Sequence, residues 1–269
     1  MIANNYYSLI HSMGSGIVLD SDAQAFITAA NITDNTQKSA IRTLVSDLKS
    51  YSLWSKMRAI YPFVGGTATS HKFNLKDPRD LDAAFRILWS GGITHSSTGV
   101  LFNGTTGYGD TNFNSLTNGS QDSAHISFYS RTTSNGTEID IGNGFNSFNQ
   151  GSLLEIRTSG VTYGKVNQTS VYNSFSDADS KGMYLVNRTA SNATNIWKNS
   201  TKQVQNTTVS NTPANYTYYL GAVNNTNVAQ FFTTKQCAFA TIGDGLTDTD
   251  VTNLYSAVQS FQTSLSRQV

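Results

Sequence analysis

The chain is poor in charged residues, and neither sign dominates. Charged side chains make up 13% of the 269 residues, against a usual share of roughly 25%. With 18 basic and 17 acidic residues the formal net charge is +1. The charge therefore gives no reason to expect binding to nucleic acid or to an anionic membrane. Asn, Thr, Ser and Gly supply the polarity instead, a mixture typical of short strands joined by turns.

Cysteine and long apolar runs are also scarce. The single cysteine, Cys237, excludes a disulfide within the chain and a zinc site built from cysteines. It lies in the strand-like run KQCAFATI, where we expect a buried, unreactive thiol. No run approaches the roughly 18 apolar residues of a membrane span. The opening MIANNYYSLIHSMGSG lacks both a basic start and an unbroken apolar stretch, so it does not resemble an ordinary signal peptide.

The first third of the chain divides into two regions. Residues 1–20 are aromatic and Asn-rich without periodicity; an arm that docks on a partner subunit and a loosely ordered tail would both have this composition. Residues 21–84 read as a helical preface with a connecting loop. Apolar residues three and four apart between Ala40 and Tyr51 form one helix face, and Asp34 with Gln37 resembles a capping box. Residues 53–61 read as a further helical turn or two.

Residues 85–269 have the pattern of a β sandwich that ends in a helix. Turn residues separate short strand-like segments at 85–89, 100–103, 153–158, 161–166, 182–187, 195–198, 217–223, 230–233 and 237–242. Short strands at such spacing predict an antiparallel sandwich or barrel, and nothing resembles alternating β-α units. At the end, Thr247 with Asp250 forms a helix cap ahead of an apolar face that extends to Leu265.

Residues 122–142 read as a β-hairpin around Asn135-Gly136, a dipeptide suited to a type I′ turn. A two-residue loop would pair Arg131 with Asp140. Alternation then places Ile126, Phe128, Ile139 and Ile141 on a core face, and Tyr129, Arg131, Glu138 and Asp140 on a solvated face.

The segment Glu138-Ile139-Asp140-Ile141 resembles the active strand of laminarinase-like glycoside hydrolases, which have a concanavalin A-like sandwich. The family pattern is E-x-D-x-E or E-x-D-x-x-E, in which the first Glu is the nucleophile and the last is the acid/base. A retaining mechanism needs two carboxyls about 5 Å apart on one face. Here Gly142 and Asn143 stand where the proton donor would be, so we expect no enzymatic activity at this segment.

Two short segments could donate oxygen atoms to Ca²⁺. Asp110 and Asn112 alternate at a strand end, where a hydrogen-bonded turn is the favoured alternative. Asp177 and Asp179 begin like a calcium loop, but Lys181 occupies the fifth position and no closing Glu follows. We therefore expect no cofactor, with Ca²⁺ as the exception to test.

Aromatic and amide side chains are the residues with which β sandwiches bind sugars, by stacking on apolar sugar faces and by hydrogen bonds to hydroxyls. Each aromatic could equally be a core residue. The candidates are Tyr108, Tyr129, Tyr163, Tyr172 and Trp197.

Several longer segments resemble one group of proteins. GVLFNGTTGYGDT (99–111) resembles the opening strand and turn of laminin-G/concanavalin A-like jelly rolls, and the segment from Gly182 to Lys198 resembles their later hairpin. The helical preface and the ending AFATIGDGLTDTDVTNLYSAVQSFQTSLSRQV resemble those of such domains in bacteriophage virion proteins. The resemblance implies a mainly β, concanavalin A-like antiparallel jelly-roll sandwich.

The same resemblance implies a function on the virion surface, as a fibre, spike or decoration component with affinity for a host glycan. It implies partners among other virion proteins, contacted through residues 1–20, and a homo-oligomer, without nucleic-acid binding or membrane insertion. Two alternatives stay open: a polysaccharide-degrading enzyme on the same scaffold, and a structural module without a ligand.

Overall fold

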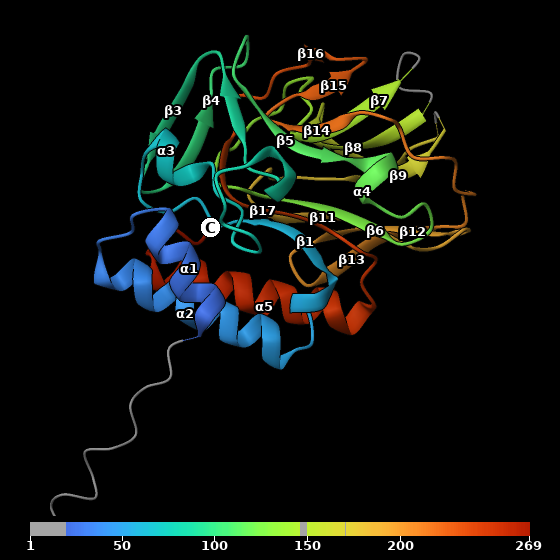
Figure 1. Ribbon diagram of the computed structural model, residues 1–269. Coiled ribbons are helices and arrows are strands. Elements are labelled where there is room, and N and C mark those ends of the chain that lie inside the picture. Colours follow the sequence, from blue (N-terminus) through green and yellow to red (C-terminus); the bar gives the residue numbers. More distant parts are fainter. Residues whose placement is uncertain (1–19, 146–149, 170) are drawn as a thin grey trace, which may run out of the picture.

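Two stacked β-sheets and a layer of helices make up the described part of the chain, which comprises residues 20–145, 150–169 and 171–269 of the computed structural model (Figure 1). The layer consists of α1 (Ser21–Ala29), α2 (Asn35–Ser50) and α5 (Asp248–Ser264). Two one-turn helices, α3 (Ala68–His71) and α4 (Ser115–Asn118), lie in connections between strands. Among the helices of these ranges, none has the length and apolar character needed to cross a membrane.

The sheet beneath the helices, called the helix-covered sheet from here on, has the order β13-β12-β11-β6-β17-β4-β3, and β1 also pairs with β17. Its strands are β1 (Met57–Tyr61), β3 (Ile93–Ser96), β4 (Gly99–Phe102), β6 (Ala124–Ser130), β11 (Gly182–Ala190), β12 (Ala193–Lys198), β13 (Thr201–Asn206) and β17 (Gln236–Gly243).

The second sheet has the order β10-β9-β8-β7-β14-β5-β2, with β15 and β16 attached at β7. Its strands are β2 (Leu88–Ser90), β5 (Tyr108–Asn114), β7 (Ile141–Phe145), β8 (Gln150–Thr158), β9 (Val161–Gln168), β10 (Asn173–Ser176), β14 (Thr217–Leu220), β15 (Val223–Asn225) and β16 (Val228–Gln230). In the described residues only β7 with β15 is a parallel pair. The predicted mainly β, antiparallel jelly-roll sandwich is confirmed.

Apolar residues fill two separate layers, one between the sheets and one beneath the helices. Strand β6 contributes to both, because Ile126 and Phe128 face the second sheet whereas Tyr129 faces the helices. All seven residues of β6 are buried in consequence. Within the described residues no such helical layer covers the second sheet, whose outer face lies on the side of the sandwich away from the helices (Figure 1).

The helices begin where the sequence places polar caps. Thr247 forms the predicted capping box with Asp250 at the start of α5. At the start of α2 only half of the predicted box forms: Asp34 accepts from the N–H of Gln37, but the Gln37 side chain accepts from the N–H of Gly65 instead. Helix α1 is capped by Asp20, whose side chain accepts from the backbone N–H groups of Asp22 and Ala23. The predicted arm, residues 1–20, lies outside the described residues apart from this cap.

Two local predictions are wrong because long-range pairing overrides them. Residues 57–61 form strand β1 rather than a helical turn, since their backbone pairs with β17 from Gly243 to Ala240. Within it, Met57 and Ile60 contact the helix side while Ala59 and Tyr61 contact the inter-sheet core. The strand expected at 85–89 begins only at Leu88.

The predicted hairpin at 122–142 is also wrong, because β6 and β7 belong to different sheets. Both edges of β6 are occupied, by β11 and by β17, so β7 cannot pair with it. Asn135 and Gly136 lie in the loop that crosses between the sheets, and neither has the positive φ of a type I′ turn. Ile126 and Ile141 do share a core, but they approach it from opposite sheets.

Candidate functional site

A shallow depression lies on the outer face of the second sheet. It consists of two adjoining hollows of about 320 and 100 Å³ that share Glu155 and Tyr172. The larger is lined by Glu155, Thr158, Tyr163 and Tyr172, and the smaller by Thr137, Ile139, Leu153, Glu155, Tyr172 and Phe231. We call these residues together the aromatic hollow.

Strand alternation places the lining residues of β8 outward. Leu154 and Ile156 belong to the core between the sheets, so Leu153 and Glu155 between them point away from it. Glu155 lies opposite Tyr163 of β9 in the register of the sheet. Leu153 joins Ile139 and Val223 in a small apolar cluster against which Tyr172 packs. The hollow thus combines an apolar floor with a carboxyl group and two phenols.

The two tyrosines meet edge to face, with ring centroids 6.4 Å apart and an interplanar angle of 84°. Lys165 Nζ lies 4.8 Å from the centre of the Tyr172 ring. This lysine is buried, which lowers its pKa to about 8. Its ammonium also donates a hydrogen bond to the carbonyl oxygen of Thr169. The cation therefore contacts the face of the Tyr172 ring, and the same residue lines both parts of the hollow.

The carboxyl group of Glu155 is the polar element of the hollow. Burial raises its pKa, against the opposing effects of a hydrogen bond from Thr158 and the charge of Lys235. A half-buried carboxylate can accept hydrogen bonds from hydroxyl groups of a ligand, while the phenol rings offer apolar surface. Such a surface is chemically suited to a sugar ring.

The five aromatic candidates from the sequence fall into three groups. Tyr163 and Tyr172 lie together in the aromatic hollow. Tyr108 stacks on Tyr219 at 4.5 Å in the second sheet and lines neither part of the hollow. Tyr129 and Trp197 are buried beneath the helices and do not face solvent, contrary to the expectation for ligand-stacking residues.

The physical reason for this correction is the helical layer. Tyr129 donates its hydroxyl hydrogen bond to Gln259 of α5, and Trp197 donates its indole N–H to Asn195 at 2.8 Å. The alternation of a strand shows which side chains share a face, but it does not show that a distant helix covers that face.

In both segments considered for Ca²⁺, the carboxylates accept hydrogen bonds from, or form ion pairs with, groups of the protein itself. Asp110 accepts a hydrogen bond from the backbone N–H of Asn112, and the side-chain amide of Asn112 donates to the carbonyl oxygen of Arg86. This is the hydrogen-bonded turn that the sequence pattern favoured over an ion site. Asp177 is buried and pairs with Lys198 at 2.6 Å, so a lysine ammonium already neutralises it. Its neighbour Asp179 accepts from the N–H of Lys181. Within residues 20–145, 150–169 and 171–269, no group of three His, Cys, Asp or Glu side chains could hold a metal.

Glu138 and Asp140 lie on the crossing loop and not on a solvated sheet face, so that expectation is wrong. Glu138 accepts hydrogen bonds from Ser134, Thr233, Thr234 and Lys235. Burial opposes its ionisation, but the bonds from Thr234 and the charge of Lys235 outweigh burial and lower its pKa to about 2. Arg131 donates to Arg267 and Gln236 and is not the partner of Asp140. A glycosidase nucleophile instead needs an open cleft for the sugar.

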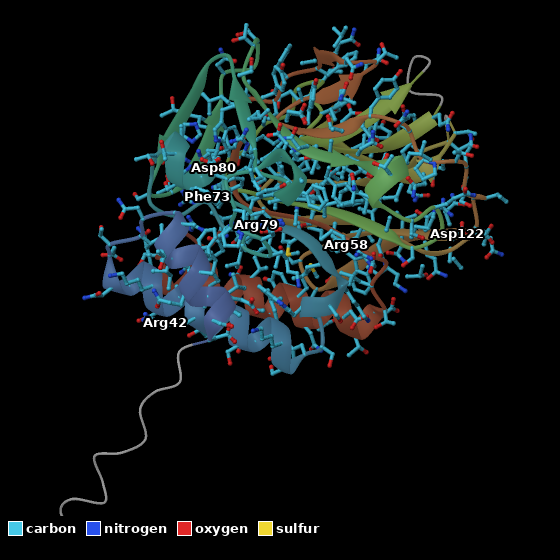
Figure 2. The ribbon with its side chains drawn as sticks, in the orientation of Figure 1. Arg42, Arg58, Phe73, Arg79, Asp80 and Asp122 are labelled. Carbon is cyan, nitrogen blue, oxygen red and sulfur yellow. The ribbon has the colours of Figure 1, made fainter. Side chains whose placement is uncertain are left out.

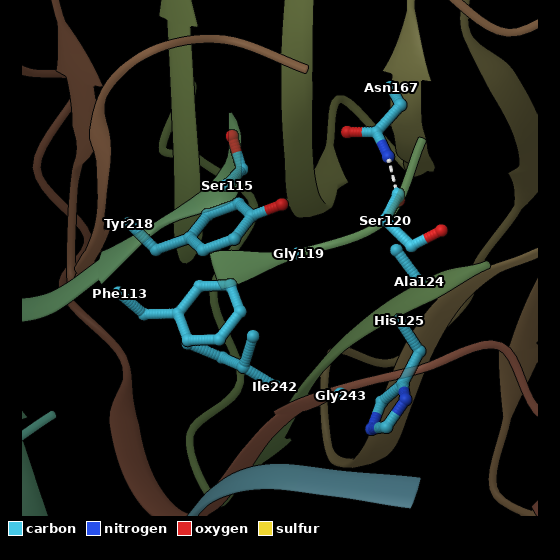
Figure 3. Close-up of a pocket in the computed structure, with 10 residues that line it drawn as sticks. All are labelled: Phe113, Ser115, Gly119, Ser120, Ala124, His125, Asn167, Tyr218, Ile242 and Gly243. Atoms are coloured by element: carbon cyan, nitrogen blue, oxygen red, sulfur yellow. Dashed lines mark hydrogen bonds between the residues drawn. The ribbon is translucent and has the colours of Figure 1, made fainter. Parts of the chain in front are cut away.

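Two other features are less suited to a ligand than the aromatic hollow. Figure 3 shows a cavity of about 10 Å³ beside His125 and Tyr218, where Asn167 donates to the carbonyl oxygen of Ser120; it has room for about one water molecule. Between residues 72 and 86, Asp80 pairs with Lys72 and Arg86, and Asp77 pairs with Arg79; Arg79 and Asp80 are labelled in Figure 2.

Comparisons with known proteins concern the fold. No protein-family model and no curated protein matches the chain. The botulinum neurotoxin serotype D binding domain matches 76% of this chain over 52% of its own, with a TM-score of 0.50 and 12% identity. Domain 4 of AbnA, a GH43 extracellular arabinanase from Geobacillus stearothermophilus solved in complex with arabinotriose, matches 74% of this chain and 98% of that domain (TM-score 0.49, 16% identity).

The CBM40 of the Ruminococcus gnavus IT-sialidase matches 48% of this chain and 80% of its own (TM-score 0.38, 13% identity). At identities this low a likeness concerns the fold alone. The neurotoxin domain, with the higher TM-score, supports the sandwich architecture.

Sequence reasoning missed Glu155, Ile139, Leu153 and Phe231 of the aromatic hollow. An available signal was the strand at 153–158, in which Glu155 stands between two core residues and so must point outward. No local signal could add Ile139 and Phe231, because they reach the hollow from two separate crossing loops.

Proposed function

We propose that this chain is a carbohydrate-binding sandwich displayed on the surface of a bacteriophage virion, as a fibre, spike or decoration component. The observation that carries the binding part is the aromatic hollow: two phenols and a half-buried carboxyl group on the outer face of the second sheet. Tyr172 and Tyr163 stack on the apolar face of a sugar ring, and Glu155 accepts hydrogen bonds from its hydroxyls. The virion part rests on the sequence resemblance.

The proposed role is binding without cleavage. The closed surroundings of Glu138 support this, since its carboxylate is held by four side-chain donors and does not line the aromatic hollow. Proposed partners are other virion proteins, contacted through residues 1–20, and further copies of the same chain. Neither metal nor nucleic acid enters the proposal.

The binding proposal is tested on a glycan array followed by titration calorimetry of the ligands it identifies. The panel includes arabinotriose and α2,3- and α2,6-sialyllactose, because structures of similar fold were solved with these ligands. We expect Tyr172→Ala to weaken binding about tenfold, equivalent to about 1.4 kcal/mol for one lost stacking contact. Tyr108→Ala is the matched control, since it removes a tyrosine from the same sheet outside the hollow.

Equal loss in the two variants, or no glycan bound by the wild type, would contradict the site. Polysaccharide that becomes shorter in the presence of the wild type but not of Glu138→Gln would establish the enzyme alternative. The virion role is tested by mass spectrometry and imaging of purified particles. Absence of the chain from particles that carry their other structural proteins would refute it.

A further inference from the structure

Two loops that cross between the sheets meet in a buried polar cluster. The loop from β6 to β7 carries Glu138 and Asp140, and the loop from β16 to β17 carries Lys235. Lys235 Nζ lies 2.9 Å from Glu138 Oε2 and 3.4 Å from Asp140 Oδ1. The side chains of Lys235 and Asp140 are fully buried, and that of Glu138 is 10% exposed. An amine and two carboxyl groups are thus held together away from solvent.

Thr233 indicates how this cluster is protonated. Its Oγ1 accepts from the N–H of Lys235 and lies 2.7 Å from Asp140 Oδ1 and 3.0 Å from Glu138 Oε2. A hydroxyl has one proton, so Thr233 can donate to only one of the two carboxyl groups. The other contact is a hydrogen bond only if that carboxyl group is itself protonated and donates to Thr233. Burial raises the pKa of Asp140 to about 6, against the charge of Lys235, whereas that of Glu138 is lowered. Asp140 is therefore the carboxyl that takes the proton.

We propose that Lys235 and Asp140 condense into an intramolecular isopeptide bond, with Glu138 as the proton acceptor. This goes beyond the proposed glycan-binding role, because it concerns a covalent link within the fold. The bond would join the two crossing loops, and through them the two sheets.

The reaction balances with groups already in the cluster. The Lys235 ammonium gives a proton to the Glu138 carboxylate, and the free amine attacks Cγ of protonated Asp140. The developing negative charge falls on Oδ2, which accepts a hydrogen bond from the N–H of Ile156 at 2.8 Å. The second amine proton passes to Oδ1, which leaves as water while the carbonyl re-forms. The products are one amide, one water molecule and a protonated Glu138.

The fold holds the reacting groups in contact and excludes water, two conditions that favour formation of an amide bond. Main-chain hydrogen bonds from Ile139 to Phe231 and from Asp140 to Leu154 hold the acceptor loop in place. Groups held at contact distance react with effective concentrations far above those in free solution. Burial of Lys235 and Asp140 excludes the bulk water that would reverse the reaction.

Intact-mass spectrometry of the purified full chain is the direct test. We expect the wild type to be lighter than its sequence by one water molecule, and a proteolytic digest to contain one branched peptide that joins Asp140 to Lys235. A wild-type mass equal to that of the sequence would overturn the proposal, and this measurement depends on no variant being able to fold.

Three variants separate the proposed roles. Lys235→Arg retains a positive charge but cannot form the bond, so it should have the full sequence mass and a lower melting temperature. Glu138→Gln retains both reacting groups, and we expect it to be purified mostly unlinked. Lys198→Arg is the matched control, because Lys198 pairs with buried Asp177 at 2.6 Å without a second carboxylate as partner. It should keep the wild-type deficit of one water. If Lys235→Arg were still lighter than its sequence by one water molecule, the water would have been lost at another pair of residues, and the assignment to Lys235 and Asp140 would be refuted.

Discussion

The side chain of Arg267, near the end of the chain, is buried and donates hydrogen bonds only to neutral oxygen atoms in the described residues. It ties the segment after α5 to the end of β1 and to β17. The acceptors are Gln262 Oε1 and the carbonyl oxygens of Pro62, Phe63, Ser97 and Ala238. The guanidinium also lies 5.3 Å from the centre of the Phe261 ring. We predict that Arg267→Ala destabilises the protein strongly.

The expected loss of stability follows from the buried carbonyl oxygens that the substitution leaves without a donor. Three carbonyl oxygens, of Pro62, Phe63 and Ala238, lose a donor at 2.7 to 3.0 Å. Each hydrogen bond to a charged group contributes about 1.5–3 kcal/mol, and water entering the vacated space recovers part of it. We therefore expect a loss of about 3–5 kcal/mol in the free energy of unfolding, a large fraction of the roughly 5–15 kcal/mol typical of a domain.

Urea unfolding followed by tryptophan fluorescence measures this loss. With a slope of about 1–3 kcal/mol per molar, the midpoint should fall by at least about 1 M. Arg58→Ala is the matched control, since Arg58 is half-exposed and pairs with Asp244 at the surface; we expect it to change stability by less than about 1 kcal/mol. Equal effects of the two substitutions would refute the reasoning that burial of the donor decides the cost.

Two further predictions concern buried titratable groups. Burial lowers the pKa of His125 to about 4 from 6.5, so the unfolded chain takes up this proton first and stability is lost as the pH falls from 6.5 towards 4. His125→Gln should make the pH dependence of unfolding shallower in that window by up to about 1.4 kcal/mol per pH unit; parallel wild-type and variant curves would contradict this. Burial raises the pKa of the Cys237 thiol well above its ordinary value. Iodoacetamide should therefore label Cys237 only after unfolding, and rapid labelling of the native protein, measured by mass, would contradict its burial.

The parts of the fold that follow from neighbouring residues could be predicted from the sequence. The apolar residues from Ala40 to Leu48 form one packed face of α2. The cap of this helix is a local hydrogen bond between Asp34 and Gln37, three residues apart. The strand at 153–158 likewise follows from its own composition and alternation. In each case the physical cause lies within a few residues of the effect.

The hairpin prediction failed for the opposite reason. Asn135-Gly136 has the composition of a tight turn, but which strand pairs with β6 is decided by β11 and β17, which are distant in the sequence. Once both edges of β6 are paired, the chain after Ser130 cannot fold back to pair with β6. Turn composition carries no information about that competition.

The same limit applied to the candidate site. Tyr163 and Tyr172 were predicted from residue type and from their place in or beside a strand, but their edge-to-face contact depends on how β9 turns towards β10. Tyr129 had the same local pattern and lies in the core, because α5 covers its face of the sheet. Residue type and strand alternation identify an aromatic side chain as a candidate. Whether a ligand can reach it depends on which distant elements pack over it in the tertiary structure.

The positions of the helical layer and of the aromatic hollow bear on how the proposed module would be displayed. The described chain enters at Asp20, which caps α1 within the helical layer. The hollow lies on the outer face of the second sheet. The helix-covered sheet separates the second sheet from the helices (Figure 1). The proposed attachment through the residues before Asp20 would therefore join the described module at its helical side. In the proposed virion role the proposed binding face would then be directed away from the particle, which is the orientation that contact with a host surface requires.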